Sequence, residues 1–415
     1  MPSSVPVIDL RPWFGPHEPG RAEAARAAVA AEVDAALQSV GFFLISGHGV
    51  PDGLRARVRA QARTFFALPL AAKQRYAVTV GGRGWLPPGV EANGYAEGTQ
   101  TPPDLKESFA VGADQAAVAA EVDAALQSVG FFLISGHGVP DDLRARVRAQ
   151  ARAFFALPAA AKQRYAVTVG GRGWLPPGVE ANGYAEGTQT PPDLKESFAV
   201  GADQATGDAE VDGYWFQPNV YPAEVPGLEP AIVGYLAQMH ALADELLVLC
   251  AAALGLERDF FTRHTGHATH TMNVNWYPPM AVAGAPEPGQ FRIGPHTDFG
   301  TVTILDREPG RGGLQVWTER DGWEDAPYVP GAFTINTGDL LARWSGGRWK
   351  SNRHRVLPPQ AEAPDEDLVS LVYFYEADHD AVIESLRPPI GRPNDFAPVV
   401  SAQFLKERLD AITIG

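Results

Sequence analysis

The chain has 415 residues, of which 45% are apolar and 20% are charged, and its formal net charge is −15. These values are ordinary for a globular protein, but the acidic balance argues against a nucleic-acid partner or a basic membrane-binding patch. No secretory signal pattern and no run of 18 uncharged apolar residues is visible, and Cys250 is the single cysteine. We therefore expect no internal disulfide, no membrane span and a cytoplasmic location.

Much of the N-terminal half is a tandem repeat. Residues 27–115 and 116–204 match at an offset of 89 residues and differ only at Gly53/Asp142, Thr64/Ala153 and Leu70/Ala159. The period is too long for a solenoid unit and two copies are too few for an array, which favours a recent in-frame duplication or an error of gene assembly. Removing one copy leaves 415 − 89 = 326 residues. We expect the chemistry to lie where the sequence occurs once.

Each copy predicts a small mixed domain. A strand over residues 5–10 precedes the first copy, and an alanine-rich helix over 21–38 leads into it and is followed by a buried strand over 41–45. An amphipathic helix over 54–66 follows, with arginines on one face, and then a loop over 81–101 rich in glycine and proline. Everything from residue 27 onward recurs in the second copy.

The unique part begins near Thr206 and changes character along its length. A long apolar helix is predicted over 229–256, followed by short strands over 271–277, 291–298, 301–305, 313–318, 332–337 and 368–375. This order predicts an α+β fold with a double-stranded β-helix, or jelly roll, flanked by helices. The expected division is 1–26 as an N-terminal strand and helix start, 27–115 as copy one, 116–205 as copy two and 206–415 as the jelly-roll domain, with its core over about 268–380.

One short motif in the predicted jelly roll is typical of a metal site. His296 and Asp298 are two residues apart on a strand, so both side chains point to one face. His354 lies on another strand-like segment and supplies a third ligand. Two histidines and one carboxylate form a facial triad that holds Fe(II) and leaves positions open for a cosubstrate and O2.

The wider pattern resembles the isopenicillin N synthase-like branch of the non-haem Fe(II)/2-oxoglutarate oxygenases. The resemblance rests on 296–300 (HTDFG), 336–341 (NTGDLL), 348–356 (RWKSNRHRV) and the Asn275-Trp276-Tyr277-Pro278 motif, with 47–50 (GHGV) and 104–107 (DLKE) in the N-terminal domain. It implies that His296, Asp298 and His354 bind iron. It also implies that Asn275, Tyr277 and Ser370 line the cosubstrate pocket. The implied reaction decarboxylates 2-oxoglutarate with O2, with ascorbate as a further candidate reductant, and hydroxylates or desaturates a small molecule through an Fe(IV)-oxo intermediate.

One position departs from that family. The family pattern places an arginine two residues before the serine, where it pairs with the remote carboxylate of 2-oxoglutarate, but this chain has Leu368 there. Another cation takes over, or the cosubstrate differs, or the enzyme is inactive. Arg292 is the candidate replacement, because it shares strand parity with His296, although a rim position is an equal alternative.

Several alternatives stay open. The enzyme is a 2-oxoglutarate-dependent oxygenase, an iron oxidase that works without 2-oxoglutarate, or a misassembled product that retains the fold as a binding module. His264, His267 and His270 form a rival histidine cluster, for which a loop is the preferred interpretation. We expect the substrate pocket to be walled by residues 279–290 and by the segment after Asp380. We also expect copy two to dock on the barrel and copy one to be displaced with its apolar strand exposed, giving a monomer or a swapped dimer.

Overall fold

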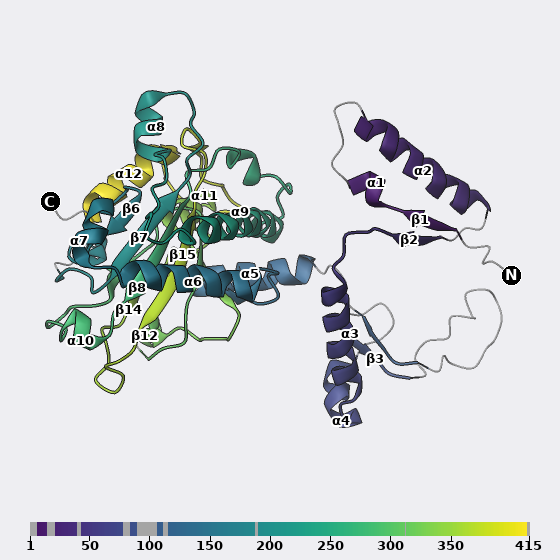
Figure 1. Ribbon diagram of the computed structural model, residues 1–415, viewed down its shortest axis with the longest axis horizontal. Coiled ribbons are helices and arrows are strands. Elements are labelled where there is room, and N and C mark those ends of the chain that lie inside the picture. The colour runs from purple at the N-terminus through teal and green to yellow at the C-terminus, as the bar shows by residue number, and fades with distance from the viewer. Residues whose placement is uncertain are drawn as a thin grey trace. The chain divides into compact units, whose positions relative to one another are not determined.

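A computed structural model describes residues 6–14, 21–39, 43–77, 84–88, 106–110, 115–186, 190–311 and 313–412. The chain forms two compact units, Met1–Ala113 and Asp114–Gly415. In Figure 1 the purple elements belong to the first unit and the blue to yellow elements belong to the second. The expected loop over 81–101, as well as Phe42, Asp104 and Leu105, lies largely or wholly outside the described residues.

The first unit contains copy one. Its helices are α1 (Arg11–Phe14), α2 (Arg21–Ser39), α3 (Asp52–Phe66) and α4 (Leu70–Lys73), and its strands are β1 (Val7–Asp9), β2 (Leu44–Ser46), β3 (Gly84–Leu86) and β4 (Ser108–Ala110). β1 pairs with β2 in parallel and β3 pairs with β4 antiparallel, giving two separate two-stranded sheets. Leu44 and Ile45 are about half exposed, at 51% and 48%. The expected exposure of this apolar strand therefore holds for these two residues, whereas Phe43 is partly buried against the cluster of Ile8, Val29 and Ala36.

The second unit contains copy two and the jelly roll. Copy two supplies α5 (Gln115–Ser128), β5 (Phe131–Ile134), α6 (Asp141–Phe155), α7 (Ala159–Lys162), β6 (Gly173–Leu175) and β7 (Glu196–Gly201). The unique part supplies α8 (Ala209–Trp215), α9 (Leu228–Ala253), α10 (Met280–Ala283), α11 (Asp339–Trp344) and α12 (Ser401–Ile412). Its strands are β8 (Thr271–Tyr277), β9 (Ile293–His296), β10 (Val302–Asp306), β11 (Leu314–Thr318), β12 (Gly322–Asp325), β13 (Phe333–Thr337), β14 (His354–Val356), β15 (Leu368–Tyr375), β16 (Val382–Ile383) and β17 (Val399–Val400).

Two sheets build the jelly roll. The larger has the order β5-β13-β10-β15-β8-β7-β6, and the smaller has the order β12-β11-β14-β9. Copy two therefore extends the larger sheet at both ends, since β5 pairs with β13 and β7 pairs with β8, both antiparallel. This is the docking expected for copy two. Because its strands continue the sheet, copy two and the jelly roll form one compact unit, and a domain boundary at residue 205 stays a prediction.

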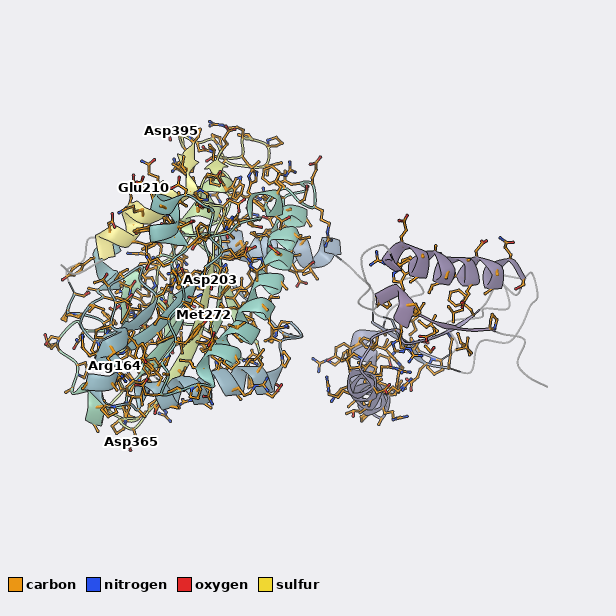
Figure 2. The ribbon with its side chains drawn as sticks, turned by 45° about the horizontal axis from the view of Figure 1, so that its top comes forward. Arg164, Asp203, Glu210, Met272, Asp365 and Asp395 are labelled. Atoms are coloured by element: carbon orange, nitrogen blue, oxygen red, sulfur yellow. The ribbon has the colours of Figure 1, made fainter. Side chains whose placement is uncertain are left out.

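Helices cover the outer face of the larger sheet. The long helix α9 packs against α5, α6, β10 and β15, and its buried face, which includes Ile232, Tyr235 and Leu247, joins the main hydrophobic core. By length and composition alone α9 is apolar enough to cross a membrane, but the core helix of a globular domain has the same composition. In Figure 2, Met272 of β8 lies inside this unit, whereas Arg164 and Asp365 lie at its periphery.

The predicted elements of the unique part are present with small shifts. The strands over 271–277 and 368–375 have the expected bounds, and the others begin or end within two residues of them. Alternation of apolar residues locates strands well because it reports burial on one face. β12, which forms a hairpin with β11, was not predicted. Its sequence Gly322-Trp323-Glu324-Asp325 is short and partly exposed, so it carries little apolar signal.

Candidate metal centre and its two cavities

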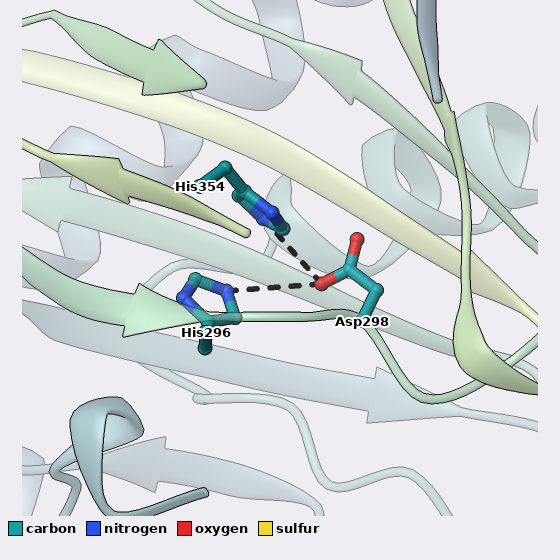
Figure 3. A group of neighbouring side chains, drawn as sticks. All are labelled: His296, Asp298 and His354. Atoms are coloured by element: carbon teal, nitrogen blue, oxygen red, sulfur yellow. Dashed lines mark ion pairs between the residues drawn. The ribbon is translucent and has the colours of Figure 1, made fainter. Parts of the chain in front are cut away.

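The pairing of β9 with β14 brings together the three residues of the predicted triad. His296 at the end of β9 lies directly opposite His354 at the start of β14, and Asp298 follows β9 two residues later. The Nε2 atoms of His296 and His354 lie 3.7 Å and 3.6 Å from Asp298 Oδ1. Figure 3 shows both imidazoles directed toward that carboxylate. Antiparallel register therefore joins ligands that are far apart in the sequence.

The remaining polar atoms of the triad are already occupied. The Nδ1 atoms of His296 and His354 lie 2.8 Å and 3.2 Å from the carbonyl oxygens of Gly294 and Asn352, and in both residues Nε2 is the nitrogen that faces Asp298. All three candidate ligand atoms lie within 4.8 Å of one another. This donor set, with one fixed nitrogen from each histidine and one carboxylate oxygen, fits Fe(II).

Two neighbours hold the other oxygen of Asp298. The Thr303 hydroxyl and the Asn336 amide donate hydrogen bonds to Asp298 Oδ2, at 2.6 Å and 2.7 Å. Burial would raise the pKa of Asp298, but the two imidazoles and these two hydrogen bonds together lower it below its usual value. Burial lowers the pKa of His296, which keeps that imidazole neutral and able to bind a cation. Asp298 and His296 are therefore in the protonation states that metal binding requires.

A cavity of about 90 Å³ lies beside the triad and contains the predicted cosubstrate residues. We call it the Arg307 cavity. Its lining includes His296, Asp298, His354, Asn275, Tyr277, Ser370, Leu368, Arg307 and Tyr328. Burial, above all, raises the pKa of Tyr277 to about 12, so its hydroxyl stays protonated. Asn275, Tyr277 and Ser370 are thus brought together next to the triad, as expected.

Arg292, the predicted replacement for the missing arginine, is fully buried. Its Nη1 atom lies 2.6 Å from Glu366 Oε2 in an ion pair, and its guanidinium lies 5.7 Å from the centre of the Tyr277 ring. The side chain therefore points inward rather than to the rim. It is not among the residues that line the Arg307 cavity, and Glu366 neutralises its charge.

A second cavity, of about 150 Å³, also reaches the triad. We call it the Arg172 cavity. His296, Asp298, Asn275, Ile293 and Phe374 line both cavities. Its other walls include Arg172, Glu180, Asn182 and Lys195 of copy two, Asn273 and Glu376 of the jelly roll, and Leu405 and Leu409 of α12. The expected contribution of the C-terminal segment is confirmed by α12, but the described residues lining the two cavities include none from 279–290.

Charged groups in the Arg172 cavity are deeply buried. Lys195 forms an ion pair with Glu180 and donates to the Ser197 hydroxyl at 2.9 Å. Burial lowers the pKa of Arg172 to about 10. Burial and the nearby charge of Asp298 raise the pKa of Glu376 to about 8. Sequence reasoning missed Arg172, Glu180 and Lys195 because it assigned the repeat to a separate domain. The one available signal was 193–198 (DLKESF), which it used only for the resemblance.

The rival histidine cluster takes up other contacts. His267 Nε2 lies 2.5 Å from the Gln204 carbonyl oxygen, His264 packs on the Trp344 ring, and His270 packs on Tyr373. Within the described parts of the chain, 296, 298 and 354 are the only group of three that meets the geometry for a metal ion. The interpretation of residues 264–270 as a connection into β8 is supported.

Comparisons with known proteins agree with this site. Residues 268–377 match the 2OG-Fe(II) oxygenase superfamily, and the model described as "non-haem dioxygenase in morphine synthesis N-terminal" matches twice, at 5–116 and 111–224. Validamycin A dioxygenase of Streptomyces hygroscopicus subsp. limoneus is 44% identical over 302 residues, 72% of this chain and 83% of that protein. The 2-oxoglutarate-dependent dioxygenase caaD of Aspergillus niger is 32% identical over 331 residues, 77% of this chain and 92% of that protein.

A solved structure supports the fold. A full-length protein of Neurospora crassa, in complex with alpha-KG and thymine, superposes with a TM-score of 0.62 at 27% identity, covering 72% of this chain and 92% of that one. The two N-terminal matches reflect the tandem repeat. The relatives support the use of 2-oxoglutarate rather than the oxidase alternative. The sequence-based resemblance is confirmed, and the chain belongs to the 2OG-Fe(II) oxygenase superfamily.

Proposed function

We propose that His296, Asp298 and His354 hold the Fe(II) of a dioxygenase that hydroxylates or desaturates a polar small molecule. The observation that carries this proposal is the pair of cavities that meet at the triad. In this assignment 2-oxoglutarate occupies the Arg307 cavity and the substrate occupies the Arg172 cavity. One iron centre would then contact both molecules, as coupled oxidation of a cosubstrate and a substrate requires.

When bound, the iron supplies the activation of O2 and the oxidation of a substrate C–H bond. The residues of the chain hold the ligands in position and exclude water from the centre. His296, Asp298 and His354 are between 6% and 9% exposed, so bulk water has little access to the centre. The Ser197 hydroxyl donates to Asn275 Oδ1 at 2.7 Å, which orients an amide that lines both cavities. Copy two therefore helps to build the centre from the neighbouring strand β7.

The lining of the Arg172 cavity favours a polar substrate. Arg172 donates to the backbone oxygens of Gly170 and Trp215, both at 3.2 Å, and has no ion pair among the described residues. Its Nε and Glu376 Oε2 are buried polar atoms without a hydrogen-bond partner in the described part of the chain. Such atoms are costly to leave unsatisfied, so a ligand with matching donors and acceptors would bind there. Validamycin A, which appears in the name of the 44% identical relative, is the first compound to test.

The test uses the purified full chain without oxygen. Addition of Fe(II) and then 2-oxoglutarate should produce the weak visible charge-transfer band of the chelate, and H296A should not produce it. On admission of air, succinate should form faster when an accepted substrate is present. Iron binding without the band would reject the cosubstrate assignment, and unchanged iron affinity in H296A would reject the triad.

The expected setting of the enzyme also remains a proposal. Cys250 is buried and unpaired, and burial raises the pKa of its thiol to about 12, so it is chemically inert. We place the protein in the cytoplasm, without a nucleic-acid or membrane partner, as a monomer or a swapped dimer. Size-exclusion chromatography with light scattering separates these two assembly states.

A further inference from the structure

At position 368 this chain has leucine where the family pattern has an arginine that pairs with the cosubstrate's remote carboxylate. Leu368 lines the Arg307 cavity and pairs across the sheet with Tyr277. In the proposed function, which this inference deepens, the cavity takes up 2-oxoglutarate, a dianion with one carboxylate remote from the keto group. Burying that carboxylate without a cation is strongly unfavourable. Leucine offers no charge, so a cation would have to come from elsewhere in the chain.

The register of the sheet places an arginine next to the expected position. β10 pairs antiparallel with β15, and the last pair is Asp306 with Leu371. One further step puts Arg307 opposite Ser370. Alternate residues of β10 share a face, and Thr303, Leu305 and Arg307 all line the cavity. Asp306 points the other way, toward Arg144 of α6.

Arg307 also lacks an ion-pair partner among the described residues, as expected of a residue that binds an anionic ligand. Its Nη2 donates to the carbonyl oxygens of Ala326 and Pro327, and its guanidinium lies 5.5 Å from the centre of the Tyr328 ring. Among the described residues it has no carboxylate within ion-pair distance, and its Nε and Nη1 have no acceptor. Burial lowers its pKa, which the Tyr328 hydroxyl only partly offsets. Arg307 is therefore a partly buried cation whose charge no carboxylate among the described residues neutralises.

The other charged groups near the cavity are already paired. Glu308 lines it, but its carboxylate lies 2.6 Å from Arg152 Nη2 of α6. Arg292 has its ion pair with Glu366. Among the described lining residues, Arg307 is the only arginine or lysine.

We propose that Arg307, the residue directly after β10, binds the remote carboxylate of 2-oxoglutarate, beside Ser370 and Tyr277, in place of the arginine absent from position 368. Neighbouring strands lie roughly 5 Å apart, and an arginine side chain is long enough to span that distance. The planar guanidinium suits a two-point contact with a carboxylate. The cation would thus come from the residue that follows β10 rather than from β15.

The test compares two ligands that differ only at the remote end. In 2-oxopentanoate a methyl group replaces the remote carboxylate of 2-oxoglutarate, while the keto acid end is the same. Anaerobic titrations of the Fe(II) protein, followed by the visible chelate band, give a dissociation constant for each ligand. R307Q should weaken 2-oxoglutarate binding by about 30-fold or more and should change 2-oxopentanoate binding by less than about threefold. Fe(II) affinity should not change.

R292Q is the matched control, because it removes a fully buried arginine whose guanidinium lies 5.7 Å from the centre of the Tyr277 ring. It should leave the preference for 2-oxoglutarate over 2-oxopentanoate close to that of the wild type. R307K retains the positive charge but not the planar guanidinium, so its affinity for 2-oxoglutarate should lie between those of the wild type and R307Q. In the double variant R307Q/L368R, a guanidinium returns to β15 and should restore much of the 2-oxoglutarate affinity.

Three results would overturn the proposal. They are an unchanged 2-oxoglutarate affinity in R307Q, an equal loss for both ligands, and a selective loss in R292Q instead. Far-ultraviolet circular dichroism and the Fe(II) titration show whether each variant is folded, and R307K extends the test if R307Q is not. A wild-type protein that binds iron but shows no band with either ligand would reject the proposed function itself, which is a different outcome.

Discussion

Asp298 depends on two neutral neighbours for its orientation. Thr303 and Asn336 both donate to Oδ2, so Oδ1 remains the oxygen that lies near the two imidazoles. Hydrogen bonds of this kind fix ligand direction, and their loss typically costs a factor of 10–100 in metal affinity, roughly. The ligand set alone therefore does not determine how tightly the site binds iron.

Replacement of Thr303 by valine tests this dependence. T303V keeps the shape of the side chain and removes the hydroxyl, so Fe(II) affinity should fall by about tenfold or more. T334V is the control, since Thr334 is also 4% exposed, on the adjacent strand β13, and has no hydrogen bond to Asp298 among the described contacts. Competitive titration with a chromogenic chelator measures both. Equal losses in the two variants would mean that general packing, not the hydrogen bond, controls affinity.

Glu376 links the site to pH. Burial, with the nearby charge of Asp298, raises its pKa from an ordinary value near 4.5 to about 8. Between about pH 4.5 and pH 8, the Glu376 carboxyl therefore keeps its proton in the folded protein, whereas the same group in the unfolded chain has lost it. The contribution to stability is fully present below the unfolded pKa and is lost as the pH rises through the folded pKa.

E376Q should remove this dependence. In the metal-free protein, the wild type should lose stability relative to E376Q between pH 5 and pH 8, by an amount on the order of 2 kcal/mol. Urea denaturation at both pH values measures the difference. Parallel pH profiles for the two proteins would show that Glu376 is ionised in the folded state.

Among single residues, sequence reasoning was most successful for site residues that lie close together in the sequence. The His296–Asp298 spacing fixes a shared face on any strand, so the pair could be recognised without the fold. Arg307 could not, because its importance depends on the register of β10 against β15 and on the lack of an anionic partner. Arg292 was selected on parity alone, and parity does not reveal Glu366.

The repeat allows one helix to be compared in two environments. α3 and α6 have nearly the same sequence, yet α3 has no buried residues, whereas α6 buries seven, including Val147, Arg148 and Phe154. Local sequence forms the helix in both copies, and tertiary contact determines which face is buried. This is why the helices were predictable and the burial of two arginines on α6 was not.

Those two arginines join α6 to the sheet. Arg144 and Arg148 both form ion pairs with Asp306 of β10, whose carboxylate is fully buried, at 2.6 Å and 2.7 Å. Burial would raise the pKa of Asp306, but the two guanidinium groups lower it overall. Removal of one partner leaves a buried charge with less compensation, which is costly. The contact fixes β10, which carries Thr303 and ends directly before Arg307.

R148A should therefore destabilise the protein by about 3 kcal/mol. R59A changes the equivalent residue of copy one, which is exposed on α3, and should have no measurable effect on unfolding of the second unit. Thermal or urea unfolding, followed by tryptophan fluorescence, compares the two variants. If R59A were as destabilising as R148A, copy one would have to share the role assigned to α6.

For the whole molecule, the repeat means that the same domain sequence is present twice. The described residues that line both cavities belong to copy two or to the unique part. Copy one retains Arg83, Asn93 and Lys106, the equivalents of Arg172, Asn182 and Lys195. Either copy therefore carries the side chains that the Arg172 cavity needs, and linkage to residue 205 favours copy two.

In the second unit, one edge of the larger sheet has no further strand paired with it among the described residues. β5 is the end strand of that sheet, while the N-terminal strand β1 pairs in parallel with β2 of copy one, with Val7 opposite Leu44. Leu133 of β5 is the equivalent of Leu44. In a chain with one copy, β1 would be linked to the copy that carries β5. It could then pair along this edge in the same register and cover exposed backbone groups.

Two deletions test whether the copies are interchangeable. Removal of 27–115 or of 116–204 gives chains of 415 − 89 = 326 residues that differ only at the three positions where the copies differ. Both should bind Fe(II) and 2-oxoglutarate with affinities within about threefold of the full chain, because every site residue is retained or has an equivalent. Both should also elute as monomers and aggregate less, since no unplaced copy exposes Leu44 and Ile45. If both shorter chains folded but failed to form the chelate band, the second N-terminal copy would be a required part of the enzyme rather than a duplicate.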